Sequence, residues 1–133
     1  MSDEDASQNF IQFGVAATLL RQYAAEQRDF LAMLASLLQR VVPEATEVHR
    51  RGGWFAQKTI QGVTVTLGEN RYTLEDTGHG SLQASCTRIV RGIALKTERI
   101  TVQDWLQALG AFLDECARTS AAARDALARF VGW

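Results

Sequence analysis

The stretch Val63-Thr-Val-Thr-Leu-Gly-Glu-Asn-Arg-Tyr-Thr-Leu-Glu75 decides the fold class of this chain. Apolar residues alternate with polar ones in both halves of the stretch, which is typical of β-strands with one face on a core. The central Gly68-Glu69-Asn70 predicts a turn, because glycine and asparagine tolerate a positive φ. The stretch is therefore predicted to be a β-hairpin, and the segments on both sides of it have helical patterns.

Upstream of this hairpin, Gly52-Gly53 lies between short polar and aromatic runs and predicts a two-residue hairpin turn. The strands beside that turn are expected over Thr46–Arg51 and Trp54–Leu67. The third strand is Arg71–Asp76. Local turns of this kind favour antiparallel pairing.

Downstream, the segment 82–98 is predicted to be the fourth strand of an antiparallel meander. Leu82, Ala84 and Cys86 alternate on one face, and the alternation resumes out of phase at Ile89. A change of phase by one residue predicts a bulge or a bend. Gly92 is a second flexible point in this segment.

The N-terminal part is predicted to be one long helix from about Ser7 to Val42. Pro43 ends it, because the residue before a proline is pushed out of the α region. Apolar residues recur at alternating spacings of three and four, and Gln27 interrupts them once. The stripe consists of Phe10, Phe13, Ala17, Leu20, Ala24, Leu31, Leu34, Leu38 and Val41.

The length of this helix raises the question of what covers its stripe. A straight helix of about 34 residues would be roughly 50 Å long. A domain of this size is only roughly 36 Å across. Either the helix breaks, near Gly14 or around Gln27, or another chain covers part of the stripe. We favour the second alternative, which predicts self-association through a set of stripe residues: Phe13, Leu20, Leu34 and Val41.

Two helices are predicted after the sheet. Thr101 to Asp104 is a variant of the capping box and starts a helix that runs to about Arg118. Thr119 or Ser120 then caps a last helix, 121–131. The predicted fold is α+β, with a long N-terminal helix, a four-stranded antiparallel meander and both C-terminal helices packed on one face of the sheet. Residues 1–7 are predicted to be a disordered acidic tail, and residues 8–133 a single α+β domain.

The composition and charge of the chain limit the classes of function that are expected. A length of 133 residues suggests one domain, and a net charge of −1 argues against a dedicated nucleic-acid binder. The N-terminus lacks the features of a signal peptide, and no apolar run approaches the ~20 residues of a membrane helix. We therefore expect a cytoplasmic protein that is not bound to a membrane. Cys86 and Cys116 lie inside apolar patterns and are expected to be reduced and buried.

No catalytic, cofactor-binding or metal-binding residues are predicted. His49 and His79 have no partners at the spacing of metal ligands. Asp76, His79 and Ser81 fall within one turn, where a catalytic triad rarely finds its geometry. The chain is therefore expected not to be an enzyme.

The most unusual candidate surface is the hairpin of Arg50, Arg51, Trp54 and Phe55. Two arginines beside a flexible tip could bind phosphate groups or an acidic partner, and bases could stack on Trp54. The alternative is a solvated hairpin whose aromatic side chains fold back onto the sheet. We favour this alternative, because the chain as a whole is not basic.

The order of the predicted elements, a helix, then a meander, then a helix, resembles that of two kinds of small dimeric protein. These are a class of nucleoid-associated proteins and the type III secretion chaperones. The resemblance lies in element order alone, so no functional residue is carried over. The favoured prediction is a non-catalytic protein-interaction module, an adaptor or chaperone-like homodimer with a protein partner. The alternative is a weak nucleic-acid-binding protein acting through the Arg50–Trp54 hairpin.

Overall fold

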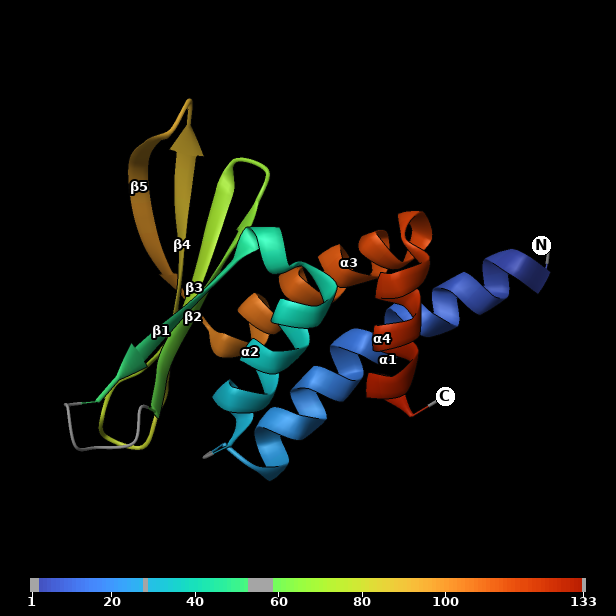
Figure 1. The fold of residues 1–133 in the computed structure, drawn as a ribbon, viewed down its shortest axis with the longest axis horizontal. Coiled ribbons are helices and arrows are strands. Elements are labelled where there is room, and N and C mark those ends of the chain that lie inside the picture. Colours follow the sequence, from blue (N-terminus) through green and yellow to red (C-terminus); the bar gives the residue numbers. More distant parts are fainter. Residues whose placement is uncertain (1–2, 28, 53–58, 133) are drawn as a thin grey trace.

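An antiparallel sheet carries the described helices on one of its faces (Figure 1). The computed structural model describes residues 3–27, 29–52 and 59–132, with side chains from Gly14 onward. The elements, in chain order, are α1 Asp3–Ala25, α2 Phe30–Val41, the 3-10 helix η1 Pro43–Ala45, β1 Thr46–Arg51, β2 Thr59–Leu67, β3 Asn70–Asp76, β4 Leu82–Val90, β5 Ile93–Ile100, α3 Val102–Thr119 and α4 Ala121–Val131.

The sheet is a meander of five antiparallel strands in the order β1-β2-β3-β4-β5. The predicted α+β class is confirmed, but the predicted number of four strands is wrong. Arg91 and Gly92 have φ values of 53° and 80°, which suit a two-residue type I′ turn. This turn divides the predicted fourth strand into β4 and β5. The predicted irregularity is present, since the β4–β5 register shifts between Arg88 and Ile89. The extra residue, however, is Leu95 on β5.

The connection between β1 and β2 is longer than expected. A two-residue turn at Gly52-Gly53 would pair Arg51 with Trp54. Instead Arg51 pairs with Thr59 across the ladder, so the predicted turn is wrong.

The predicted long N-terminal helix is also wrong, because α1 ends at Ala25 and α2 begins at Phe30. The break lies around Gln27, where polar residues interrupt the apolar stripe. Helical hydrogen bonding ends with Glu26 N–H, which donates to Gln22 O at 3.0 Å, and resumes with Met33 N–H, which donates to Asp29 O at 3.1 Å. Helix α1 starts at Asp3, inside the stretch for which a tail is expected.

The helices form two layers on the sheet. Helices α2 and α3 lie against the strands, while α1 and α4 pack on them from the far side (Figure 1). The middle position of α2 follows from its sequence, since a helix that is apolar on most sides must be buried on most sides. Of the two C-terminal helices, only α3 therefore packs on the sheet, and the prediction that both do is wrong for α4. The buried residues of α2 are Phe30, Leu31, Leu34, Ala35, Leu37 and Leu38.

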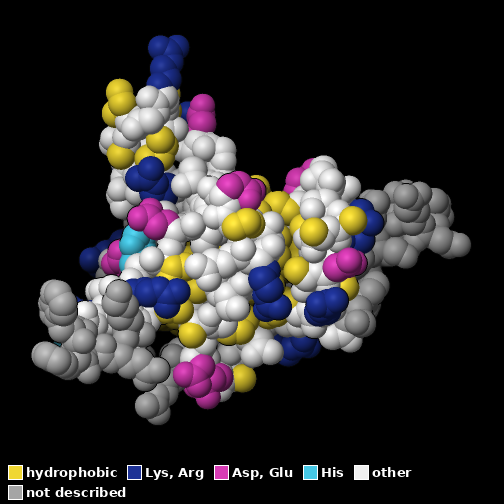
Figure 2. All heavy atoms as spheres, viewed as in Figure 1, with side chains coloured by type: hydrophobic (Ala, Val, Ile, Leu, Met, Phe, Trp, Pro, Cys, Tyr) yellow, Lys and Arg dark blue, Asp and Glu magenta, His cyan; other side chains and the backbone are white. Residues whose placement is uncertain are grey.

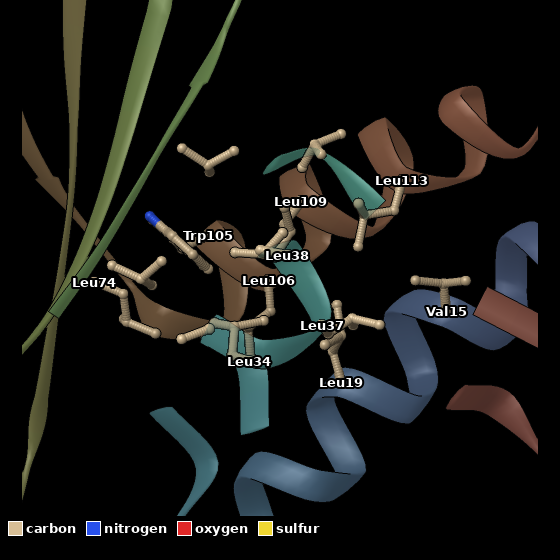
Figure 3. Packing of buried hydrophobic residues seen from close by; sticks show 14 of the residues in the cluster. Val15, Leu19, Leu34, Leu37, Leu38, Leu74, Trp105, Leu106, Leu109 and Leu113 are labelled. Atoms are coloured by element: carbon tan, nitrogen blue, oxygen red, sulfur yellow. The ribbon is translucent and has the colours of Figure 1, made fainter. Parts of the chain in front are cut away.

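The core is centred on Trp105 of α3, which lies between Leu74 of the sheet and Leu38 of α2 (Figure 3). The Trp105 side chain is fully buried, and its ring meets that of Tyr72 edge to face with centroids 6.5 Å apart. The start of α3 is fixed by Thr101, whose hydroxyl accepts a hydrogen bond from Asp104 N–H at 3.0 Å, as the capping pattern predicts. In the described part of the chain, no helix combines the length and apolar character that crossing a membrane requires.

Helices α1 and α3 approach each other closely at Gly110. A Cβ atom added there would lie 2.8 Å from Ala16 Cβ and 2.9 Å from Ala16 Cα. We therefore expect Gly110→Ala to lower the free energy of unfolding by about 1–3 kcal/mol, because the backbones must move apart. Denaturant unfolding measures this effect.

Gly14→Ala is the matched control for that prediction. Gly14 also lies in a helix, but among the described residues its added Cβ would meet only Val131 Cγ1, at an ordinary 3.8 Å. This substitution should be neutral or stabilising by up to about 1 kcal/mol, since alanine favours the helix. Equal effects of the two substitutions would contradict the close α1–α3 crossing.

Candidate functional site

The β4–β5 hairpin is the most exposed part of the described chain. It projects beyond the helical layers (Figure 1), and every residue from Ile93 to Arg99 is exposed. Figure 2 shows hydrophobic side chains gathered on this projection, with a Lys or Arg side chain at its end. Because β5 ends the strand order, no strand of the described residues lies beside one of its two edges.

Two large apolar side chains stand out on β5. Ile93 is 64 % exposed and Leu95 is 60 % exposed, and no other large hydrophobic side chain of the described residues is so exposed. Single exposed apolar residues are common on protein surfaces and need no explanation. Here, however, two of them lie on the same strand, at the outer edge of a projecting hairpin.

The direction of the backbone groups on β5 follows from two hydrogen bonds on the other side of β4. Thr77 N–H donates to Ser81 O at 3.1 Å, and Ile89 N–H donates to Glu69 O at 2.7 Å. Odd-numbered residues of β4 therefore face β3. Because backbone groups alternate in direction along a strand, the even-numbered residues of β4 face β5.

Alternate residues of β5 point their backbone groups away from β4. Arg88, Cys86 and Ala84 face β5, and they pair with Lys96, Glu98 and Ile100. The residues between these, Thr97 and Arg99, consequently point their N–H and C=O groups away from β4. An added strand would find unpaired donors and acceptors there. We refer to Ile93–Ile100 with its outward-facing backbone as the β5 edge.

The charges on the β5 edge have opposite signs two residues apart. Lys96 Nζ lies 3.0 Å from Glu98 Oε1, and both side chains are largely exposed. Next to them, Arg88 forms an ion pair with Glu69 at 3.5 Å. On the opposite face of the hairpin, the hydroxyls of Thr87 and Thr97 lie 2.7 Å apart.

The sheet face turned away from the helices is polar. His49 Nε2 lies 2.9 Å from Thr64 Oγ1, and Thr64 Oγ1 lies 3.2 Å from Thr73 Oγ1. Thr64 is only 6 % exposed, so these groups mainly satisfy one another. This arrangement explains the alternating threonines of β2 without a ligand.

The predicted interaction residues lie at the other edge of the sheet. Arg50 and Arg51 are exposed at the end of β1. Trp54 and Phe55 lie outside the described residues. The proposed combination of arginines and aromatic side chains therefore stays a prediction.

Replacing Arg50 and Arg51 together with alanine should change the free energy of unfolding by less than about 0.5 kcal/mol per residue, since both side chains are exposed. Thermal or denaturant unfolding tests this. A larger loss would show that the arginines have structural partners. Binding of nucleic acid by the wild type that weakens steeply with salt, and is lost in this variant, would support the nucleic-acid alternative.

The residues predicted to mediate self-association lie in different environments. Leu34 is fully buried in the chain's own core. Leu20 and Val41 are half-buried against the same core, and the side chain of Phe13 lies outside those described. The break at Gln27 thus lets the chain itself cover Leu34, while a role of the other three residues in self-association stays a prediction.

The loop of Asp76, His79 and Ser81 is held by turn-type hydrogen bonds. Gly78 N–H donates to Asp76 Oδ1 at 2.8 Å, and the hydroxyl that lies 3.1 Å from Ser81 Oγ belongs to Thr77. Within the described residues, no three His, Cys, Asp or Glu side chains come near enough to share a metal ion.

The two cysteines are free, as expected, but only half-buried. Burial is the main cause that raises the pKa of both thiols, Cys86 and Cys116, so both favour the protonated form. A raised thiol pKa reduces reactivity, because the thiolate is the nucleophile. Neither cysteine is therefore included in the site.

Asp114 is a buried carboxylate that the sequence patterns did not single out. It lies one helical turn after Gly110 and is 4 % exposed, and neither of its oxygens has a hydrogen-bond partner among the described residues. Burial raises the pKa of Asp114 to about 7, while the nearby Arg118 opposes the shift. Its position on the apolar face of α3 follows from helical spacing, but a single carboxylate there gives no sequence pattern of its own.

Comparisons with known proteins identify no relative: no family model, no curated protein and no solved structure matches the chain.

Proposed function

We propose that this chain is a non-catalytic protein-interaction module, an adaptor that binds a protein partner through the β5 edge. The observation that carries the proposal is the combination of an unpaired strand edge with two exposed apolar side chains, Ile93 and Leu95. Strand addition to such an edge gains main-chain hydrogen bonds, and apolar side chains beside it add buried area and selectivity.

The chemistry of the edge supports binding to a polypeptide. Outward-facing N–H and C=O groups at Thr97 and Arg99 match the donors and acceptors of an extended chain. Natural sheets usually protect such edges with charges, bulges or short strands. Here Lys96 and the bulge at Leu95 give some protection, but the strand remains long and exposed.

The experiment compares three forms of the full chain as bait in a native lysate. The wild type should capture a reproducible set of proteins, and Ile93→Ser/Leu95→Ser should lose most of it. The double variant should still fold, because both side chains are largely exposed and surface substitutions usually change stability by less than about 0.5 kcal/mol each.

Arg50→Ala/Arg51→Ala is the matched control, because it changes two exposed residues at the opposite edge of the sheet. This variant should capture the same proteins as the wild type. Capture that is lost in the control but retained in the hairpin variant would place the binding surface on β1 instead. A folded wild type that captures neither another protein nor a second copy of its own chain would contradict the proposed function.

A further inference from the structure

We infer that the partner of the β5 edge is a second copy of this chain, paired antiparallel about a two-fold axis at Thr97. This inference rests on the proposed function and names the occupant of the same surface. It places β5 of one protomer beside β5 of the other, so that the two sheets become continuous. A two-fold contact of this kind is self-complementary, because every contact away from the axis occurs twice.

Backbone geometry limits the ways in which two β5 strands can pair. Thr97 and Arg99 face the open edge, while Lys96, Glu98 and Ile100 face β4. A two-fold pairing forms hydrogen bonds only where outward-facing residues meet outward-facing residues. The axis must therefore pass through a residue and not between two residues.

Charge then selects among these registers. With the axis at Thr97, Lys96 lies opposite the partner's Glu98, and Glu98 lies opposite the partner's Lys96. With the axis at Lys96 or at Glu98, identical charges face each other, which destabilises a cross-strand pair. An axis at Leu95 leaves Lys96 opposite the partner's Ala94 without an ion pair.

The same register pairs the part of β5 that follows the bulge. The pairing runs from Leu95 to Arg99 within Ile93–Ile100, because Ala94, on the other side of the bulge, faces outward while Ile100 faces β4. Lys96 and the partner's Glu98 form a non-hydrogen-bonded pair, in which the side chains are closest. Both groups are exposed in the single chain, so the ion pair forms from accessible side chains.

The remaining positive charges do not oppose this pairing. Arg88 already pairs with Glu69. Arg99 lies opposite the partner's Leu95, which is uncharged, and Arg91 lies at the tip of the hairpin, away from the axis. Lys96 alone would discourage any neighbouring strand. Glu98 two residues further on makes the edge acceptable to one particular strand, its own copy.

Charge reversal tests the register. Light scattering at micromolar concentration should give the wild type about twice the mass of 14.7 kDa. Lys96→Glu places a carboxylate opposite the partner's Glu98, and Glu98→Lys places an ammonium group opposite the partner's Lys96. Each single variant should weaken dimerisation about tenfold or more. The double variant Lys96→Glu/Glu98→Lys should restore it.

Mixing the two single variants separates this register from effects within one chain. In a mixed dimer, the carboxylate introduced by Lys96→Glu meets the ammonium group introduced by Glu98→Lys. The unchanged Glu98 of the first variant meets the unchanged Lys96 of the second, so both contacts are attractive. An equimolar mixture should therefore form dimers that neither variant forms alone. Each single variant also loses its own 96–98 ion pair, and mixing cannot restore that intrachain pair.

Cross-linking provides a second measurement. Thr97→Cys should form an interchain disulfide, because the two Cα atoms of a hydrogen-bonded pair lie about 5.5 Å apart, within disulfide range. Arg99→Cys should not, since the two Arg99 residues lie on opposite sides of the axis. The wild type measures the background from Cys86 and Cys116.

The outcomes distinguish this inference from the proposed function. A wild-type mass near 14.7 kDa, or a mixture of folded single variants that stays monomeric, would overturn self-pairing. If Ile93→Ser/Leu95→Ser still loses a protein captured by the wild type, the proposed function stands with a different partner. If the wild type is monomeric and Ile93→Ser/Leu95→Ser captures the same proteins as the wild type, both self-pairing and the proposed function are overturned.

Discussion

Leu34→Ala is expected to lower the free energy of unfolding by about 2–5 kcal/mol, the cost of a cavity at a fully buried leucine. The Leu34 side chain is completely inaccessible and belongs to the core shared by α2, the sheet and α3. Denaturant unfolding measures the loss. Because Leu34 is covered by its own chain, the loss should not depend on protein concentration.

Leu20→Ala is the matched control, since it removes the same atoms from a side chain that is only half-buried. Its cost should be closer to about 1 kcal/mol, the centre of the range for single substitutions. If the effect of Leu34→Ala grew as the protein was diluted, Leu34 would instead lie between subunits. That result would restore the continuous helix with a stripe covered by another chain.

Asp114→Asn is expected to stabilise the protein at pH 8 by about 2–4 kcal/mol, with the gain disappearing near pH 4. Burial raises the pKa of Asp114 from 3.8 to about 7 in the folded chain. The folded state therefore holds this proton more tightly than the unfolded state does. The wild type loses stability as the pH rises between these values, and each unit of pKa difference corresponds to about 1.36 kcal/mol. Asparagine carries no charge, so the variant does not lose this stability as the pH rises.

The measurement is the difference in unfolding free energy between the variant and the wild type across this pH range. Asp125→Asn on α4 is the control, because Asp125 is exposed and its replacement should change little at any pH. A gain from Asp114→Asn that is the same at pH 4 and pH 8 would show that the carboxylate is already solvated or paired in the folded protein.

Local patterns predicted most elements of the fold. The alternation from Val63 to Glu75 corresponds to β2 and β3, and the caps at Thr101 and Ser120 begin α3 and α4. These features depend on neighbours in sequence, which propensity and capping rules describe directly.

The errors arose where more than one local structure was compatible with the pattern. Arg91-Gly92 forms a tight turn, although arginine is an unusual residue at positive φ, so β4 and β5 were taken as one strand. The break around Gln27 was recognised as an alternative. Choosing it required knowing that α2 would fill the space between the sheet and α4.

The candidate site was harder to predict than the fold. The residues of β5 were recognised as a strand, but only the strand order shows that β5 is an edge. Likewise, the spacing of Lys96 and Glu98 has meaning for pairing only once Thr97 is known to face outward. Asp114 was missed because a single carboxylate on an apolar helix face gives no pattern of its own.

The most direct test of the open β5 edge is residue-resolved amide hydrogen exchange along the strand. At low concentration, the amides of Thr97 and Arg99 should exchange rapidly, while those of Glu98 and Ile100, which face β4, should be protected. Raising the protein concentration should protect Thr97 and Arg99 as a second strand pairs with them. Equal protection of all four amides at low concentration, or Thr97 and Arg99 amides that remain rapid at every concentration, would contradict an open edge that binds its own copy.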